Sequence, residues 1–335
     1  MSDFSDVMQR WAQPSVGAHC LLNTDDDDLT VWALAQSNER SVWQCHFRFE
    51  SHQSCAQQGL STLTFPALPE ERFSAVYWTW PKARAEANML LDWLPHLLTP
   101  TGQVWLIGHN RSGIRSAPKA LQALGWTVRK MGSARHCILL CATPPDRCAP
   151  FNLDAYWQTA TVPDVDGQIW SLPGVFAHGR IDKGSLHLLP WLKDLPSPLV
   201  DFGCGAGLLS LVAHHRNSGV NITGVDNNWL AILSSQQTAQ RNNLNLTTVW
   251  ADGLTRLAGR FAGLITNPPF HAGLNTNYDT THDLLRDSRR LMQPNGLFLA
   301  VVNDHLPYAA WLEQYLKTPH CVSHAYGFSV WLARY

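Results

Sequence analysis

Apolar and polar positions in the second half of the chain alternate between strand-like and helix-like patterns. Short apolar runs occur at 199–202, 221–225, 247–251, 263–266 and 297–302. Between them, apolar residues recur with helical spacing at 208–215, 229–242 and 280–292. This alternation predicts right-handed β–α–β crossovers and a buried, mostly parallel sheet. The last stretch, 321–335, turns through Gly327 and predicts an antiparallel hairpin at the edge of that sheet.

The first half repeats part of this order. A strand at 73–78 precedes Trp80-Pro81, and a helix at 84–97, the turn Pro100-Thr101-Gly102 and a strand at 104–108 follow. The second half has the same series, with Pro268-Pro269 after the strand at 263–266 and Pro294-Asn295-Gly296 before the strand at 297–302. We therefore predict an internal duplication. The Pro- and Asp-rich segment 143–165 is the expected linker, between domains at 1–150 and 151–335.

Length and composition agree with two globular domains. The chain has 335 residues, 45% of them apolar and 15% charged, which excludes a disordered chain and exceeds the usual size of one core. The formal net charge is -1, so nucleic-acid binding would need a local patch. The eight cysteines form no CxxC pair and have no zinc-like spacing, which predicts free thiols, no metal and a cytoplasmic location. No signal peptide or membrane span is expected.

A glycine-rich turn follows the strand at 199–202 and opens the next helix. In Asp201-Phe202-Gly203-Cys204-Gly205-Ala206-Gly207, the glycines permit a tight turn and a close approach of ligand to backbone. Asp226 ends the next strand, where a carboxylate accepts hydrogen bonds from ribose hydroxyls. Asp252, after the third strand, could bind an adenine amino group. The spacing differs from the GxGxxG of dinucleotide enzymes. The combination resembles class I methyltransferases and implies S-adenosylmethionine, with Asp201, Gly203, Gly205, Gly207, Asp226 and Asp252 as cofactor-binding residues.

The tetrapeptide Asn267-Pro268-Pro269-Phe270 directly follows the fourth strand. An exocyclic amine is a poor nucleophile because its lone pair is delocalised into the ring. The side-chain carbonyl of Asn267 and the backbone carbonyl of Pro268 can accept its N–H bonds and aim the lone pair at a sulfonium methyl. Prolines fix these acceptors before reaction, and Phe270 offers a face to a flipped base. The motif resembles the signature of methyltransferases acting on adenine N6, guanine N2 and protein glutamine.

Further segments extend the resemblance over nearly the whole length. Together with the residues 267–273, three of them are similar to the bacterial ribosomal RNA small-subunit methyltransferase C family: Leu172-Pro173-Gly174-Val175-Phe176, Asp182-Lys183-Gly184-Ser185 and Asn110-Arg111-Ser112-Gly113-Ile114-Arg115-Ser116. The resemblance implies an α/β fold with tandem Rossmann-like class I methyltransferase domains, each with a mostly parallel seven-stranded sheet, the N-terminal copy degenerate. It implies methylation of N2 of one guanine in 16S ribosomal RNA, on the assembled small subunit. It also implies that Phe176, Asp182 and Gly184 cover the cofactor.

The first half contains a region of one charge sign. No Asp or Glu lies between Trp93 and Pro145, whereas six cations do: Arg111, Arg115, Lys119, Arg129, Lys130 and Arg135. If several of them share a face, they could neutralise RNA phosphates; otherwise they form an ordinary solvated surface. The segment Trp78-Thr79-Trp80-Pro81-Lys82 stands where a working site would need Asn-Pro-Pro. We therefore expect an N-terminal domain that binds RNA and stabilises the chain without catalysis.

Other functions remain compatible with the sequence. Asn-Pro-Pro-Phe also fits a large-subunit guanine-N2 enzyme, an adenine-N6 enzyme or a protein-glutamine enzyme, because all of these substrates present a planar amino group. A non-catalytic RNA-binding assembly factor is a further alternative, against which the intact Asn267 and glycine turn argue. Ribosomal RNA or the small subunit is the expected partner, and we expect the chain to act as a monomer.

Overall fold

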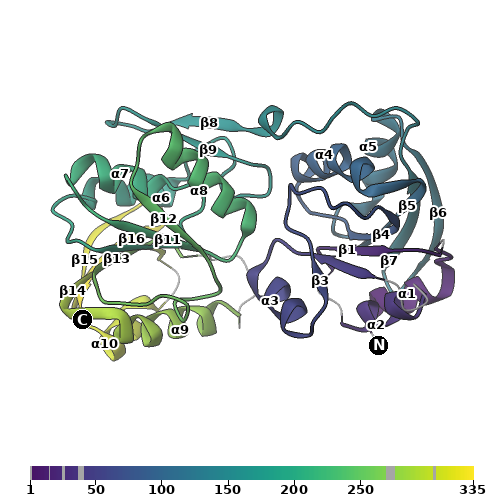
Figure 1. Ribbon diagram of the computed structural model, residues 1–335. Coiled ribbons are helices and arrows are strands. Elements are labelled where there is room, and N and C mark those ends of the chain that lie inside the picture. The colour runs from purple at the N-terminus through teal and green to yellow at the C-terminus, as the bar shows by residue number, and fades with distance from the viewer. Residues whose placement is uncertain (1, 15, 25–26, 37–40, 269–275, 305–306) are drawn as a thin grey trace. The chain divides into compact units, whose positions relative to one another are not determined.

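The computed structural model describes residues 2–14, 16–24, 27–36, 41–268, 276–304 and 307–335. It divides the chain into two compact units, Met1–Tyr156 and Trp157–Tyr335 (Figure 1). The division falls within the expected linker, just after the expected boundary at 150/151. Each unit has its own sheet and its own helices, so the expected tandem α/β architecture is confirmed.

The second unit is built on a seven-stranded sheet. Its strands are β10 (Leu199–Phe202), β11 (Ile222–Asp226), β12 (Leu246–Trp250), β13 (Phe261–Thr266), β14 (Met292–Asn303), β15 (Lys317–Ala325) and β16 (Phe328–Arg334). Their order is β12-β11-β10-β13-β14-β16-β15. The first five strands are parallel, and β16 is antiparallel to both of its neighbours. The predicted parallel sheet and its closing hairpin are therefore confirmed.

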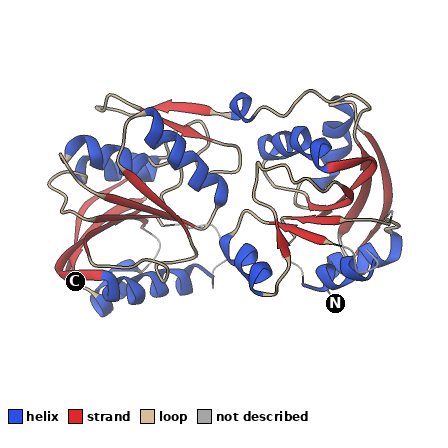
Figure 2. Ribbon diagram, in the orientation of Figure 1, coloured by secondary structure: helices blue, strands red, loops and turns tan. Residues whose placement is uncertain are grey.

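Helices cover both faces of this sheet (Figure 2). They are α6 (Lys183–Leu188), continued by η4 (Leu189–Trp191), α7 (Leu208–Arg216), α8 (Trp229–Arg241), α9 (Thr276–Leu291) and α10 (Tyr308–Tyr315). A small hairpin of β8 (Gln158–Thr161) and β9 (Gln168–Ser171) precedes them. On one face, Leu285 of α9 and Leu312 of α10 pack with Val200, Leu264 and Phe298 of the sheet, all of them nearly or completely buried. This packing explains why the three strands carry continuous apolar runs.

The strand order reverses direction between β10 and β13. The two strands are neighbours in parallel register, and Phe202 pairs with Thr266. The residues that follow, Gly203 and Asn267, therefore start at the same carboxyl edge of the sheet. In open α/β sheets ligands bind at this topological switch point.

The first unit has the same topology. Its strands are β1 (His19–Leu22), β2 (Val42–Cys45), β3 (Ser61–Thr62), β4 (Phe73–Thr79), β5 (Leu98–His109), β6 (Thr127–Ala134) and β7 (Cys137–Thr143). Their order, β3-β2-β1-β4-β5-β7-β6, matches that of the second unit strand for strand. Its helices are α1 (Asp3–Trp11), α2 (Asp27–Gln36), α3 (Phe49–Gln57), α4 (Arg84–Trp93) and α5 (Ala117–Ala123), with the 3-10 turns η1 (Leu94–Leu97), η2 (Ile114–Ser116) and η3 (Leu153–Tyr156). The predicted duplication is thus confirmed in topology.

Strand register shows how the first copy departs from the second. Trp78 in β4 and Thr266 in β13 hold equivalent positions, because each pairs with the last residue of the central strand beside it. Thr79 therefore stands where the second unit has Asn267, and Trp80 stands in place of a proline. The indole of Trp80 is 4% exposed and lies 5.2 Å from the ring of Trp78, so an aromatic pair fills this corner. At this corner the first unit therefore lacks the Asn-Pro-Pro sequence of the second.

Candidate active site

The glycine-rich turn requires glycine at three positions. Gly203, Gly205 and Gly207 have φ values of +71°, +53° and +81°, a region in which other residues are strained. A Cβ added to Gly203 would lie 3.9 Å from the backbone oxygen of Asn267, so the turn and the fourth strand meet at close range. A Cβ added to Gly205 would meet no described atom within 4 Å. This side of the turn is open to a ligand.

Asp201 supports the turn from beneath. It is fully buried, and its Oδ2 accepts hydrogen bonds from the backbone N–H of Ser210 at 3.1 Å and from the Ser210 hydroxyl at 2.6 Å. Burial raises the pKa of Asp201 to about 7, because a charged carboxylate loses its hydration there. The side chain does not line the cavity described below. The structure therefore places Asp201 between β10 and α7, where it fixes the start of the helix.

Asp226 is coupled to the turn from the neighbouring strand. Its Oδ2 accepts a hydrogen bond from Gly205 N at 2.9 Å, and its Oδ1 accepts one from Asn228 N at 2.9 Å. Burial raises the pKa of this carboxyl group above its ordinary value. Each oxygen keeps acceptor capacity, so the carboxylate can still receive ribose hydroxyls. Asp252 is exposed, and neither Asp226 nor Asp252 lines the cavity described below, so their contacts with ribose and adenine stay predictions.

An open cavity lies beside the turn. Its empty volume, which includes space open to solvent, is about 440 Å³. Five predicted site residues line it: Phe176, Asp182, Gly203, Gly205 and Asn267. The other lining residues have no role that their sequence pattern predicts; they include Ile169, Arg180, Ile181, Ser185, Cys204, Ala206, Leu208 and Leu209. The ring of Phe176 is 55% exposed, so it could cover a ligand without leaving a packed core.

The amide of Asn267 is held by two residues of the segment that precedes the first strand of this sheet. Its Nδ2 donates to Ser185 Oγ at 2.9 Å and to Asp182 Oδ2 at 3.2 Å. An ionised carboxylate only accepts hydrogen bonds, so Asp182 fixes which end of the amide is nitrogen. The two N–H groups of Asn267 are thereby engaged. No described residue donates a hydrogen bond to its carbonyl oxygen Oδ1, which can therefore accept one from a ligand.

Asp182 also begins α6. As the N-cap residue, its carboxylate accepts hydrogen bonds from Gly184 N at 2.8 Å and from Ser185 N at 3.2 Å. Gly184 is buried, and a Cβ there would lie 2.9 Å from Cε1 of Phe328, which explains the glycine. The role of Ser185 depends on this cap, because the first turn of α6 carries its hydroxyl to Asn267. An Asp followed three residues later by Ser is a weak sequence signal by itself.

Part of the predicted catalytic motif lies beyond the described residues. Pro268 follows Asn267 and is buried. Pro269 and Phe270 lie outside the described residues, as does the segment up to 275. The stacking role of Phe270 therefore stays a prediction.

The cations of the first unit are spread over several elements. Arg111 and Arg115 are exposed in the segment after β5, Lys119 is exposed on α5, and Arg129 and Lys130 are exposed on β6. Arg129 of β6 pairs with Cys141 of β7, and Cys141 pairs with Trp105 of β5. Trp105 lies four residues before His109, the last residue of β5. At about 3.3 Å per residue, this separates Arg129 from the end of β5 by about 13 Å along the sheet.

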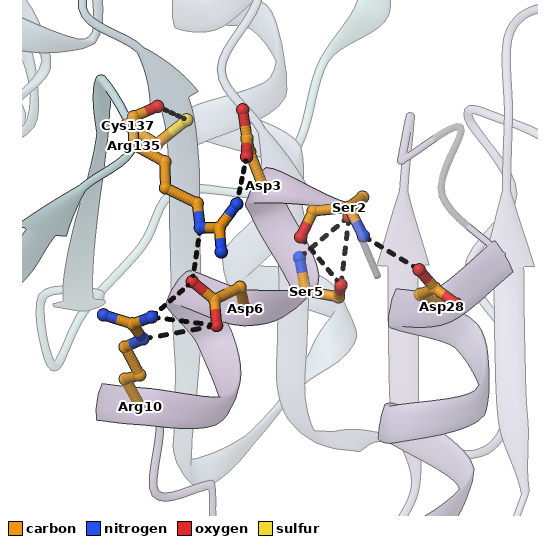
Figure 3. Close-up of polar contacts among 8 residues, drawn as sticks. All are labelled: Ser2, Asp3, Ser5, Asp6, Arg10, Asp28, Arg135 and Cys137. Atoms are coloured by element: carbon orange, nitrogen blue, oxygen red, sulfur yellow. Dashed lines mark hydrogen bonds and ion pairs between the residues drawn. The ribbon is translucent and has the colours of Figure 1, made fainter.

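Arg135 differs from the other five cations because it already has carboxylate partners (Figure 3). Its guanidinium lies 2.8 Å from Asp6 and 3.3 Å from Asp3, both on α1. The hydrogen bond and the charge of Asp6, with those of Asp3, raise the pKa of Arg135 further above its usual value. The segment from Trp93 to Pro145 contains no acidic residue, but the fold brings Asp3 and Asp6 against it. Arg135 ties the N-terminal helix to the sheet, and its charge is largely balanced.

Among the described residues, no group of three His, Cys, Asp or Glu side chains could hold a metal ion. No helix in those ranges is long and apolar enough to cross a membrane.

Comparisons with known proteins cover both units. Residues 5–160 match the family model described as the methyltransferase small domain N-terminal, and residues 166–332 match the methyltransferase small domain. A solved structure described as the T. thermophilus 16S rRNA N2 G1207 methyltransferase in complex with AdoMet and guanosine superposes with a TM-score of 0.85. It is 22% identical and covers 99% of this chain and 92% of its own, so it supports the fold.

Curated relatives are closer in sequence. Ribosomal RNA small subunit methyltransferase C of Ectopseudomonas mendocina is 34% identical over 100% of both chains. The protein of the same name from Pseudomonas aeruginosa is 35% identical over 100% of this chain and 99% of its own. With its two matched domains and similarity along its full length, the chain belongs to the ribosomal RNA small subunit methyltransferase C family.

Proposed function

We propose that this chain transfers a methyl group from S-adenosylmethionine to the exocyclic N2 of a guanine in 16S ribosomal RNA. Family membership supports the reaction and the substrate. The observation that carries the chemistry is the orientation of Asn267, whose amide nitrogen is bound by Ser185 and Asp182. This leaves an oxygen acceptor at the wall of a cavity whose other wall is the glycine turn. A planar amine is the substrate group that such an acceptor fits.

The residues present fit S-adenosylmethionine, because the turn is open at Gly205 and an open cavity lies between the turn and Asn267. S-adenosylmethionine would supply an electrophilic methyl group. Asp226 would accept hydrogen bonds from the ribose hydroxyls, and the glycine turn would leave room for the methionine portion of the cofactor. Asn267 Oδ1 would accept one N–H of the guanine amine and, with the Pro268 carbonyl, direct the nitrogen lone pair at the methyl carbon. The amine nitrogen loses its proton to water after the C–N bond forms, so no strong base is required.

Mass mapping of ribosomal RNA tests this proposal. Small subunits and free 16S RNA from a strain lacking the enzyme would each be incubated with the protein and labelled S-adenosylmethionine. We expect one N2-methylguanine in 16S RNA, with faster transfer to the assembled subunit. Label on adenine N6, on large-subunit RNA or on a protein glutamine would favour one of the other amine substrates, and cofactor binding without transfer would favour an assembly factor. Action as a monomer and in the cytoplasm remain predictions.

Substitution of Ser185 tests how Asn267 is positioned. Ser185→Ala removes one of the two acceptors of the Asn267 amide, which costs about 1 kcal/mol, or a factor of about 5 in rate. We expect kcat to fall by that factor, with the dissociation constant of S-adenosylmethionine close to that of the wild type. Ser185→Thr keeps a hydroxyl and should retain more of kcat. If Ser185→Ala lowers the melting temperature but not kcat, the serine serves only the packing of α6.

Substitution of two cations tests RNA binding by the first unit. Arg111→Ala with Arg115→Ala should weaken binding of 16S RNA and flatten the log–log salt dependence by roughly 0.7–0.9 for each phosphate that the variant no longer neutralises. Both side chains are exposed in one short segment, so they can reach the same backbone. Arg135→Ala is the matched control, because Asp3 and Asp6 already balance its charge. It should lower the melting temperature and leave the salt slope unchanged. An unchanged slope in the double variant would place the RNA surface elsewhere.

A further inference from the structure

The hairpin between β15 and β16 ends in an unusual residue. Ala325 pairs with Phe328, so the loop consists of Tyr326 and Gly327 alone. Their φ values are +58° and +82°, the signs required by a type I′ turn. Asn, Asp or Gly is preferred at the first position of this turn, and a bulky residue with positive φ is uncommon. The Tyr326 side chain is 86% exposed, so core packing does not account for it either.

The hairpin tip is fixed at the edge of the sheet that carries the active site. Asp304, just after the end of β14, donates its backbone N–H to Gly327 O at 3.1 Å. Its carboxylate lies 2.8 Å from His324 Nε2 and accepts a hydrogen bond from Ser329 Oγ. β14 is the parallel neighbour of β13, the strand that ends just before Asn267. The tip and Asn267 therefore lie at the same carboxyl edge of the sheet, where β14 separates β13 from the hairpin.

A second set of contacts links the hairpin to the catalytic amide. The ring of Phe328, two residues after Tyr326, lies directly against Gly184. Gly184 N donates to Asp182, which in turn accepts the hydrogen bond from Asn267 Nδ2. The strand that begins at the tip thus packs on the helical turn that orients Asn267. Tyr326 is thus exposed at the tip of a hairpin whose second strand contacts the turn that holds Asn267.

We propose that Tyr326 stacks on an unpaired nucleobase of the substrate RNA next to the target guanine. The inference rests on the proposed function. Methylation at N2 requires the guanine to leave its stack, which exposes the faces of its neighbours. An aromatic ring stacks on any base and stabilises binding without reading its identity. A tyrosine held in a turn that favours asparagine, with its ring in solvent at the same edge of the sheet as Asn267, meets this need. Local rules of structure are broken most often where function requires it.

Tyr326→Asn separates stacking from folding. Asn-Gly is the preferred type I′ pair, so this variant should melt at the same temperature as the wild type or higher. Its affinity for a 16S RNA transcript should fall by about 5- to 150-fold, the range expected for the loss of one stacked base. Tyr326→Phe keeps the ring and should bind close to the wild type. Both variants should bind S-adenosylmethionine normally.

Other outcomes overturn the proposal. Wild-type RNA affinity in Tyr326→Asn would remove the ring from the RNA surface. Equal losses in Tyr326→Asn and Tyr326→Phe would assign the effect to the hydroxyl group and exclude stacking. Loss of binding to assembled small subunits, with free RNA unaffected, would indicate a ribosomal protein as the partner of the ring. If the wild type neither binds nor methylates 16S RNA, the proposed function itself fails, which is distinct from all three results.

Discussion

Asn267→Ala is expected to lower the rate of methyl transfer by about 10²–10³ while S-adenosylmethionine binds nearly as well as to the wild type. The loss has the size seen when one preorganised hydrogen-bonding group is removed from an active site. Asn267 Oδ1 is preorganised because Ser185 and Asp182 hold the amide nitrogen before substrate arrives. Single-turnover transfer of labelled methyl to small subunits, with a separate cofactor titration, measures the two effects.

Two further variants make this result specific. Asn245→Ala changes an exposed asparagine of the same unit, whose amide contacts Asn221, and should leave the rate unchanged. Asn267→Asp would place a second carboxylate beside that of Asp182, so repulsion should turn the side chain away and the rate should fall as in Asn267→Ala. Full turnover by Asn267→Ala would contradict the mechanism, since the amide oxygen that is proposed to orient the amine would be gone.

Asp226→Ala is expected to weaken binding of S-adenosylmethionine by at least about 100-fold. Two hydrogen bonds from ribose to a charged group are each worth roughly 1.5–3 kcal/mol. The substitution also removes the acceptors of Gly205 N and Asn228 N, so the glycine turn loses a tie to β11. Calorimetric titration gives the dissociation constant, and circular dichroism checks that the fold persists.

The protonation of Asp226 offers a second readout. Burial raises its pKa, so the carboxylate takes up a proton at a higher pH than an exposed aspartate does. The protonated group is a poorer acceptor for ribose hydroxyls, and the affinity should therefore fall on acidification. In Asp226→Asn this part of the pH dependence should be absent. Unchanged affinity in Asp226→Ala would remove the residue from the cofactor site.

The elements of the catalytic core could be predicted because their signals are local. β10 begins and ends at the predicted residues, since a buried strand next to a glycine turn has an unambiguous pattern. The helix predicted at 84–97 instead ends at Trp93 and continues as a 3-10 turn, where Pro95 lacks the N–H of a regular helix. The edge strand β15 starts at Lys317, before the predicted 321, because half-exposed edge strands carry a weak apolar pattern.

The positions of the candidate site residues could be predicted only where backbone shape or residue type decides them. Gly203 and Gly205 are recognisable from spacing, and Asn267 from its place after the fourth strand. The buried support from Asp201, by contrast, depends on Ser210 packing beneath the turn. The partners of Arg135 lie 129 and 132 residues away in the chain, so a region read as purely basic contains a balanced ion pair. Contacts of this kind arise only when the chain has folded.

The double role of Asp182 joins two properties that are usually separate. Its carboxylate both caps α6 and orients the Asn267 amide. The opening of the first turn of α6 and the alignment of that amide are therefore thermodynamically linked. Substrate that restrains Asn267 must also lower the population in which that turn is open, by the reciprocity that governs any two coupled equilibria. Protection of the Gly184 and Ser185 amide hydrogens from exchange with solvent should therefore increase when substrate binds at Asn267.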